Sequence, residues 1–375
     1  MAEKFSLKDE LFNPTKVNQI AFEIKKAYAL FEQEKFEQEV VIKFDELELK
    51  ERIAHIRDMF RKYLPNDYIV ATDILLKALP SELDPDKMDD DFGEFIYAPY
   101  SDFVVTFGCR EEYLDFSLQA LREITKRFSV EYAIRDFINY FPEETFKMLK
   151  ACSLSKNYHE RRLASEGSRP KLPWAKKLDT EYSQPISLLD NLFTDKTRYV
   201  TRSVANHLND IAKIDASLVI DTLKRWKESK QQDEKEMQFI LSHSLRTLVK
   251  DGNSEALELL GYSANPSIEV ENFSIDNLEV YVGKALEFSF DIKAKKEEAL
   301  MVDYVLYFQT KAGKLNPKVH KIKKLNVKVG ERVSIGKKHP FKANMSTRKL
   351  YGGEHKLVLQ INGKLYEEFV FHLNV

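Results

Sequence analysis

The sequence predicts an all-α helical-repeat solenoid over residues 1–265, followed by an all-β sandwich over residues 266–375. Apolar residues in the first part recur at three- and four-residue intervals, which is typical of amphipathic helices. From about Tyr262–Ser267 onward the apolar period changes to two, as in half-buried strands. With 375 residues, the chain is long enough for two domains and a large core.

The helical part begins its clearest periodic stretch at residue 45. Leu49, Ile53, Ile56 and Phe60 share one face of a helix that Asp45 is expected to cap, with a stop at 65–67. The acidic stretch 82–91 is predicted to be a solvated loop. Further helices are predicted over 68–79, 99–107, 111–128, 131–140, 143–152, 157–165, 186–192, 198–214, 216–228, 233–250 and 253–260.

The later helices resemble one another. Arg162 and Glu166 recur as Arg202 and Asn206 at an offset of about 40 residues, and a match of 203–210 with 244–251 has an offset of about 41. This spacing predicts stacked antiparallel helix pairs, that is, a right-handed HEAT-like solenoid. The alternative is that these positions are ordinary solvated helix faces. In the solenoid, one concave wall would carry Arg162, Glu166, Arg202, Asn206 and His243.

The C-terminal part predicts seven or so short strands in about 110 residues, which fits an immunoglobulin-like sandwich. It lacks the Cys…Trp…Cys core of antibody domains. Asn362-Gly363 predicts a hairpin turn. The apolar alternation is seen at 270–275, 286–292, 302–308, 325–329, 355–361 and 366–371.

Charge is unevenly distributed although the whole chain has a net charge of only −2. Residues 266–375 contain 19 Lys and Arg against 13 Asp and Glu, a net charge of +6, which leaves −8 for the rest. The Lys-rich stretch 311–338 could be a solubilising strand edge that blocks aggregation. We favour a patch that binds phosphates, because the excess is confined to one domain.

Several classes of protein are excluded or disfavoured by the absence of their motifs. Cys109 and Cys152 lack CxxC spacing, so we expect buried free thiols in a reducing cytosol. The charged N-terminus and the lack of a long apolar run predict a cytoplasmic protein without signal peptide or membrane span. No zinc motif, P-loop, GxGxxG or GxSxG pattern occurs, so neither a metal nor a cofactor is expected.

Carboxylate chemistry remains. The segment 157–174 combines Arg162 and Glu166, one helical turn apart, with a glycine–proline exit that ends at Trp174. Glu131 is the other well-placed acid. Each glutamate alone is more often a salt-bridged or capping residue, and a lone tryptophan is more often a packing anchor. Their clustering favours a functional site.

The string His159–Trp174, HERRLASEGSRPKLPW, resembles the signature of the AlkC branch of the AlkC/AlkD superfamily of DNA alkylation-repair glycosylases. The segments 47–53, 131–135 and 200–211 are similar to other parts of that family. The resemblance spans essentially the whole chain, including a C-terminal Ig-like domain that some members carry. It implies a DNA glycosylase of base excision repair that removes 3-methyladenine and 3-methylcytosine without flipping the base.

The resemblance also implies roles for particular residues. An N3-alkylated base is cationic and leaves as a neutral molecule, so the enzyme must stabilise an oxocarbenium-like sugar and deliver water. Glu131 and Glu166 are expected to do this, and Trp174, turned toward Glu166, is expected to pack on the cation. Expected DNA contacts are Arg162, Arg169, Arg202, Asn206, Lys321, Lys323 and Lys324.

The expected partner is double-stranded DNA with alkylated bases, bound by a monomer at the bacterial nucleoid. The competing hypothesis is a non-catalytic HEAT-repeat scaffold that binds DNA or protein through the same face. A lyase acting at abasic sites ranks last, because it would need an amine nucleophile and no particular lysine stands out.

Overall fold

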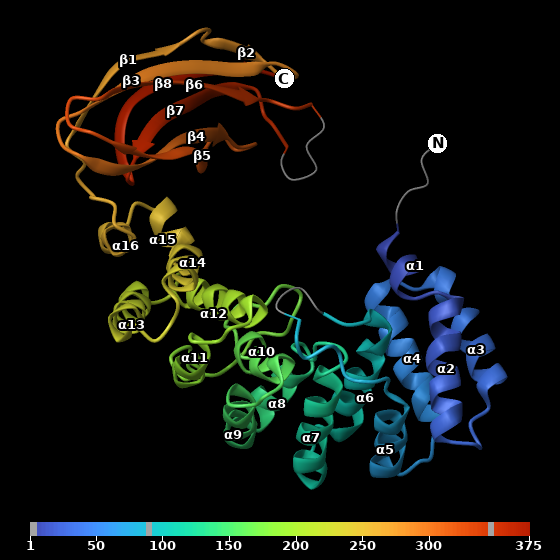
Figure 1. Ribbon diagram of the computed structural model, residues 1–375. Helices are drawn as coiled ribbons and strands as arrows, with labels where there is room; N and C mark the ends of the chain where they lie inside the picture. Colours follow the sequence, from blue (N-terminus) through green and yellow to red (C-terminus); the bar gives the residue numbers. More distant parts are fainter. Residues whose placement is uncertain (1–5, 88–91, 344–348) are drawn as a thin grey trace. The chain divides into compact units, whose positions relative to one another are not determined.

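The computed structural model describes residues 6–87, 92–343 and 349–375 as a helical region followed by two β-sheets (Figure 1). No helix among these residues is long and apolar enough to cross a membrane. The α-helices are α1 (Leu7–Leu11), α2 (Pro14–Ala27), α3 (Gln33–Val41), α4 (Leu49–Tyr63), α5 (Tyr68–Ala78), α6 (Ala98–Gly108), α7 (Leu114–Thr125), α8 (Ile134–Tyr140), α9 (Pro142–Ser153), α10 (Tyr158–Glu166), α11 (Ile186–Leu192), α12 (Arg198–Ile211), α13 (Ala216–Ser229), α14 (Glu234–Ser244), α15 (Arg246–Lys250) and α16 (Ser254–Leu259).

The contacts divide the chain into two compact units. The first holds α1 to α12 together with α14, and the second holds α13, α15, α16 and all the strands. Helix gives way to strand between Leu259 and Ile268, where the sequence predicts the change. The proposed domain boundary at 265/266 stays a prediction, because three helices on its N-terminal side group with the strands.

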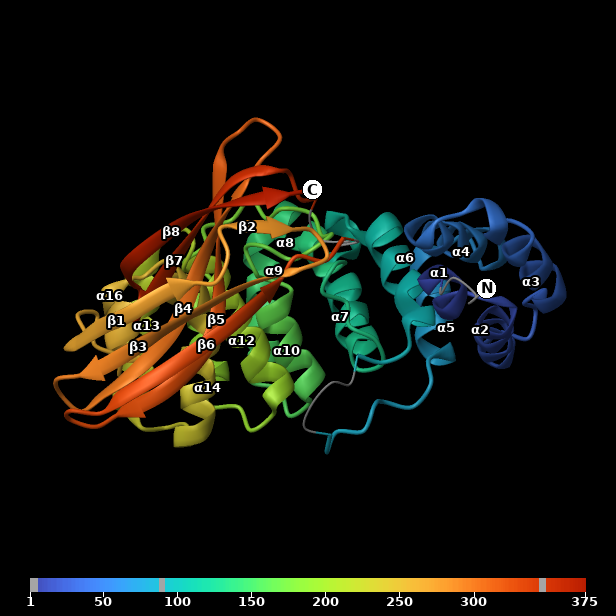
Figure 2. The same ribbon diagram turned by 90° about the horizontal axis from the view of Figure 1, so that it is seen from above.

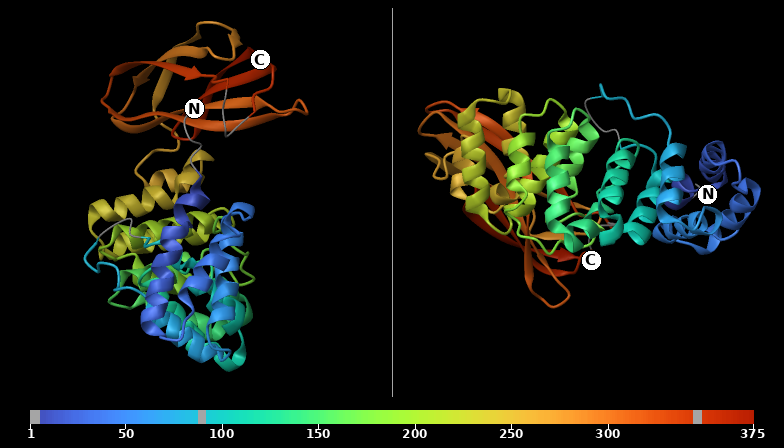
Figure 3. Two further views of the ribbon diagram at one scale, coloured as in Figure 1. Left: turned by 90° about the vertical axis from the view of Figure 1, so that its right-hand side faces the viewer. Right: turned by 90° about the horizontal axis from the view of Figure 1, so that it is seen from below.

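The first unit is built from stacked helices, as the HEAT-like prediction requires. Helices α10, α12 and α14 follow one another in a row (Figure 2), and α7, α9 and α11 follow one another in a second layer, seen from below in the right-hand view of Figure 3. Ion pairs join helices of this unit: Arg122 of α7 with Glu160 of α10 at 2.6 Å, and Arg198 of α12 with Glu236 of α14. Each glutamate is the third residue of its helix.

The 40-residue offset identifies equivalent positions correctly. Arg162 and Arg202 are the fifth residues of α10 and α12, and Glu166 and Asn206 are the ninth. The match of 203–210 with 244–251, at the 41-residue offset, does not align equivalent helix positions. It depends on the predicted single helix over 233–250, but the chain breaks at Leu245 between α14 and α15, which belong to different units.

Two other local predictions need correction or fall partly outside the described residues. Asp45 does not cap α4, because it lies in a 3₁₀ turn (Phe44–Glu46); Glu48 and Glu51 form the capping box instead. Within the predicted acidic loop, residues 82–87 form neither helix nor strand, and 88–91 lie outside the described part of the chain.

The second unit contains a three-stranded sheet of order β1-β3-β6 and a five-stranded sheet of order β2-β8-β7-β4-β5, an Ig-like architecture. Phe288, Phe290 and Tyr304 belong to its apolar core. The strands are β1 (Ile268–Ile275), β2 (Glu279–Tyr281), β3 (Ala285–Ala294), β4 (Glu298–Gln309), β5 (Leu315–Val327), β6 (Arg332–Pro340), β7 (Gly353–Ile361) and β8 (Lys364–Asn374).

The strand predictions failed where strands carry few apolar residues. The three-residue β2 and the polar β6 were missed, and the predicted strand 325–329 is only the end of β5. Strand β5 lies at an edge of the five-stranded sheet and is largely exposed, so its lysines need not alternate with apolar residues. The Lys-rich stretch is therefore largely an edge strand.

Gly167 follows α10 as predicted, but for a different physical reason. Its φ of −65° is an ordinary helical value, so the position does not require the conformational freedom of glycine. A Cβ atom here would instead lie 2.5 Å from Cγ2 of Ile134 on α8. Glycine is needed because α8 and the end of α10 approach each other closely.

We predict that Gly167→Ala lowers the free energy of unfolding by about 1–3 kcal/mol, because the added methyl overpacks this contact. Urea unfolding followed by circular dichroism measures the effect. Gly336→Ala is the control, since its Cβ would meet nothing within 4 Å and its φ is not positive. Equal stability of Gly167→Ala and the wild type would contradict the packing argument.

Candidate functional site

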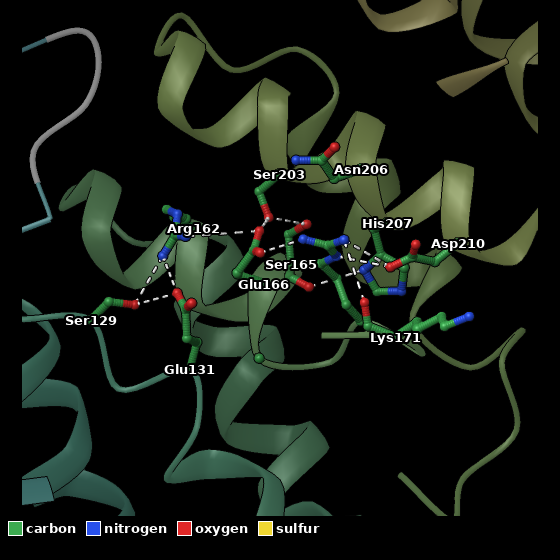
Figure 4. A network of polar contacts seen from close by, with 12 residues as sticks. Ser129, Glu131, Arg162, Ser165, Glu166, Lys171, Ser203, Asn206, His207 and Asp210 are labelled. Carbon is green, nitrogen blue, oxygen red and sulfur yellow. Dashed lines mark hydrogen bonds and ion pairs between the residues drawn. The ribbon is translucent and has the colours of Figure 1, made fainter. Parts of the chain in front are cut away.

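Arg162 is the centre of a buried polar network in the first unit (Figure 4). Its Nη1 donates hydrogen bonds to Oε2 of Glu131 at 2.6 Å and to Oγ of Ser129 at 2.9 Å. Its Nη2 lies 3.9 Å from Oε2 of Glu166, one turn further along α10. One guanidinium therefore lies between two carboxylates that are 35 positions apart in the chain, as the sequence predicts for Arg162 and Glu166 on one face.

Aromatic rings cover the remaining faces of this guanidinium. The Arg162 Cζ lies 4.4 Å from the ring centroid of Tyr199 and 5.5 Å from that of Phe92. The two rings pack edge to face with centroids 5.1 Å apart. Cation–π contacts of this kind favour the charged guanidinium and hold its plane.

Glu166 is only 5% exposed and its carboxylate is hydrogen-bonded on both oxygens. Nη1 of Arg169 donates to Oε1, and Oγ of Ser203 on α12 donates to Oε2, each at 2.5 Å. Burial by itself raises the pKa of Glu166, but the charges of Arg162 and Arg169 and these hydrogen bonds outweigh burial, so the pKa lies below its ordinary value. Glu166 is therefore an anion at neutral pH.

Glu131 approaches from the short segment before α8. Oγ of Ser129 donates to its Oε2 at 2.7 Å, and Arg162 donates to the same oxygen. The Glu131 side chain is more exposed than that of Glu166 (14% against 7%). The site thus has one enclosed carboxylate and one carboxylate that solvent can reach.

Arg169 is placed differently from the expectation that it contacts DNA. It is buried, and its Nε and Nη2 donate to Oδ2 of Asp210 at 3.0 and 2.9 Å while Nη1 holds Glu166. In this structure Arg169 is therefore a partner of Glu166 and Asp210, and its expected phosphate contact stays a prediction.

Arg162, which was also expected to contact DNA, is buried between Glu131 and Glu166, whereas the remaining expected contacts lie at more accessible positions. Arg202 and Asn206 are half-buried on α12, and Oδ1 of Asn206 is 2.9 Å from Nε2 of His243 on α14. In the sandwich, Lys321, Lys323 and Lys324 are exposed on β5. Their roles in binding stay predictions, as do the catalytic roles of Glu131, Glu166 and Trp174.

Trp174 is 74% exposed and follows Pro173 in a loop. Its φ of +62° is left-handed, and its carbonyl accepts a hydrogen bond from Nζ of Lys50 at 2.9 Å. Together with residues of α4, α6 and 128–136, it lines a cavity of about 440 Å³. Glu166 is not among the described residues that line this cavity. The expected turn of the indole toward Glu166 stays a prediction.

Sequence reasoning missed several residues of the network. Ser203 and Asp210 lay in the mistaken 41-residue match and in the family-like segment 200–211 without being singled out, and Ser129 gave no signal. His207 was also missed: its Nδ1 donates to the carbonyl of Ser165 at 3.0 Å, and burial, followed by the charge of Arg169, lowers its pKa to about 3. It is therefore a neutral side chain. Ser203, His207 and Asp210 all lie on α12, and packing of α12 against α10 brings them near Glu166.

The described residues contain no group of three or more His, Cys, Asp or Glu side chains that could hold a metal ion. Both cysteines are free thiols; Cys152 is buried, whereas Cys109 is only half-buried. What the arrangement offers is a pair of carboxylates, Glu131 and Glu166, held in place by the same arginine.

We predict that Arg162→Met lowers the free energy of unfolding by about 3–5 kcal/mol at neutral pH, because the enclosed carboxylate of Glu166 and the more exposed carboxylate of Glu131 lose their shared cation. Since Arg162 helps to depress the pKa of Glu166, the stabilisation from this anion is present at neutral pH and is lost as the pH falls through that pKa. The difference from the wild type should therefore shrink on acidification, as measured by urea unfolding at several pH values.

Lys43→Met is the control for this measurement, because the Lys43–Glu46 pair is exposed and such pairs contribute less than about 1 kcal/mol. A loss for Arg162→Met as small as that of the control would show that the two glutamates do not depend on Arg162.

Comparisons with known proteins agree with this architecture. A family model described as "Uncharacterised protein YhaZ, C-terminal Ig-like domain" matches residues 269–375. YhaZ of Bacillus subtilis (strain 168), described as an uncharacterized protein, is 31% identical over 368 residues, covering 97% of this chain and 98% of YhaZ.

The structure of the Pseudomonas fluorescens alkylpurine DNA glycosylase AlkC, bound to DNA containing an abasic site analog, superposes on this chain with a TM-score of 0.86 at 28% identity. The match covers 99% of this chain and all of that one. This chain therefore belongs, with YhaZ, to the AlkC branch of the AlkC/AlkD superfamily.

Proposed function

We propose that this protein is a DNA glycosylase that hydrolyses the N-glycosidic bond of cationic N3-alkylated bases. Its substrates would be 3-methyladenine and 3-methylcytosine in double-stranded DNA, removed in base excision repair without base flipping. The observation that carries the proposal is the pair of carboxylates, Glu131 and Glu166, held by the single buried guanidinium of Arg162. The likeness to an alkylpurine DNA glycosylase supports the choice of substrate class.

The chemistry of the lesion explains why this pair would suffice. Alkylation at N3 gives the base a positive charge, so that it leaves as a neutral molecule without protonation by a general acid. The deoxyribose then becomes oxocarbenium-like in the transition state, and a nearby anion stabilises it. An unmodified base is neutral and gains little from an anionic site, which makes charge the basis of selectivity.

The two carboxylates suit different steps. Glu166 is ionised and hydrogen-bonded to Arg169 and Ser203, so its charge is fixed in place. We assign to it the electrostatic stabilisation of the sugar cation. Glu131 is the more exposed acid and is oriented by Ser129 and Arg162, so we assign to it the orientation of the attacking water.

The cavity beside Trp174 bears on base flipping. Its described lining includes Ser129 and Tyr132, on either side of Glu131, but neither Glu131 nor Glu166. An enclosed pocket for a flipped base would have to place the glycosidic bond against a catalytic carboxylate. The cavity gives no support to such a pocket, and a lesion that stays in the duplex fits the site better.

DNA would be held by the exposed cations. Arg202 and Asn206 continue the row of inner helices beyond Arg162 and would contact phosphates near the lesion. Lys321, Lys323 and Lys324 of β5 would add sequence-independent attraction. We expect the protein to act as a monomer, in the cytoplasm at the nucleoid.

We predict that Glu166→Gln slows the release of 3-methyladenine by at least about 100-fold, since it removes the anion that stabilises the transition state. DNA affinity should stay almost unchanged. Single-turnover assays on methylated duplexes, with alkali cleavage of abasic sites, measure the rate, and fluorescence anisotropy of labelled DNA measures affinity.

Glu160→Gln is the matched control, because Glu160 is a buried, ion-paired glutamate on the same helix and binds Arg122. Wild-type release by Glu166→Gln would remove Glu166 from the mechanism. DNA binding without any abasic sites in the wild type would favour the non-catalytic scaffold.

We predict that replacing Lys321, Lys323 and Lys324 together with Gln weakens DNA binding. The slope of log Kd against log salt concentration should fall by roughly 2 to 3, about 0.9 for each lost phosphate contact. The matched control replaces Lys293, Lys295 and Lys338, which lie on or next to the three-stranded sheet and pair with Glu269 or Glu287. If both triple variants change the slope equally, β5 has no special role in binding.

A further inference from the structure

Arg135 on α8 is a buried cation that binds backbone rather than carboxylates. It is 0% exposed. Its Nε donates to the carbonyl of Lys176 at 2.6 Å, and its Nη1 donates to the carbonyls of Gly167 and Arg169 at 3.1 and 2.8 Å. One guanidinium thus joins the beginning of the loop after α10 to a point just beyond Trp174.

Neighbouring residues of α8 extend this attachment. Asp136 accepts from Nζ of Lys176 at 2.5 Å, and Asn139 donates to the carbonyl of Lys177 while accepting from the N–H of Asp179, both at 3.0 Å. The whole loop 167–179 is therefore tied to α8, the helix that directly follows the segment containing Glu131.

This arrangement is costly as a purely structural device. Burial, followed by the charge of Arg169, lowers the pKa of Arg135 to about 10, which reflects how unfavourable the charge is at this position. A well-packed apolar side chain in place of a buried charge is often neutral or stabilising. An apolar residue, however, cannot hydrogen-bond the three backbone carbonyls that Arg135 binds.

Two residues of the loop, Trp174 and Arg169, must be held in position. Trp174 has a left-handed φ, which is a strained conformation for a non-glycine residue. Lys50 of α4 holds the same residue through its carbonyl. At the other end, Arg169 must keep its position to hydrogen-bond Glu166, and its own carbonyl accepts from Arg135.

We propose that Arg135 is a positioning residue for the site. It holds loop 167–179 against α8 and so fixes the indole of Trp174 and, through Arg169, the carboxylate of Glu166. Its effect on catalysis rests on the proposed function, whereas its effect on the loop does not. Lys50 is the second anchor of the same loop.

The experiment uses Trp174 as its own probe. The chain has two tryptophans, and Trp226 is buried on α13, so a Trp226→Phe background leaves Trp174 as the single emitter. Arg135→Met, Arg135→Lys and Lys50→Met are made in this background. Tryptophan anisotropy reports the mobility of the loop, single-turnover assays report base release, and labelled DNA reports Kd.

Arg135→Met should lower the anisotropy of Trp174 and slow base release about 100-fold, as misplacement of catalytic groups by about 1 Å does. The Kd for DNA should stay within about threefold, because DNA-contacting residues are untouched. Arg135→Lys should show smaller changes, since an ammonium cannot span the three carbonyls. Lys50 is exposed, so Lys50→Met tests the loop even if Arg135→Met fails to fold.

Arg52→Met is the matched control. Arg52 is also buried and donates to backbone carbonyls, those of Lys8, Phe12 and Phe44, in the N-terminal helices. It should lose stability but keep wild-type anisotropy and rate.

Unchanged anisotropy in both Arg135→Lys and Lys50→Met would overturn the proposal, whatever happens to the rate. Equal changes in Arg52→Met would overturn it too, because the effect would then be general destabilisation. If the wild type released no base, the proposed function would fail, while the anisotropy measurements would still decide whether Arg135 holds the loop.

Discussion

The site depends on the ion pairs that Arg162 makes with Glu131 and Glu166. Two carboxylates brought together in a poorly hydrated place repel each other, and one of them would ordinarily take up a proton. A guanidinium has donors on separate nitrogens and can bind both without losing its charge. Its position on α10, one turn before Glu166, makes one contact local, and only the contact with Glu131 requires the fold.

The wider network balances its charges within a buried region. Three guanidiniums lie near three carboxylates: two of them form ion pairs, and the third, that of Arg135, binds backbone carbonyls. The opposite charges nearby explain how these groups can be enclosed together. The balance is not symmetric in exposure, because Glu131 lies at the more accessible end. This difference in exposure agrees with the proposed division of roles, in which Glu131 orients the attacking water and Glu166 stabilises the sugar cation. The six groups are Arg135, Arg162, Arg169, Glu131, Glu166 and Asp210.

Predictions from local sequence patterns were correct where the structure of a segment depends mainly on its own residues. Most helices were found within a few residues, because their apolar periodicity reflects a single buried face. Local patterns failed where contacts with other segments determine the structure. Gly167 is required by the proximity of Ile134 rather than by its own φ, and β5 is a strand because β4 pairs with it, although its side chains carry no alternating pattern.

The sequence by itself determined the class of the protein, the change from helix to strand, and the pair Arg162 and Glu166, because that pair follows from helical spacing alone. It also singled out Glu131, through resemblance. Only the tertiary structure decided that Glu131 shares the guanidinium of Arg162, and that Arg169 faces Glu166 and Asp210 rather than solvent. The contacts of Arg162 with Glu131 and of Arg169 with Asp210 join residues 31 and 41 positions apart through helix stacking, and no local pattern encodes which side chains stacking brings together.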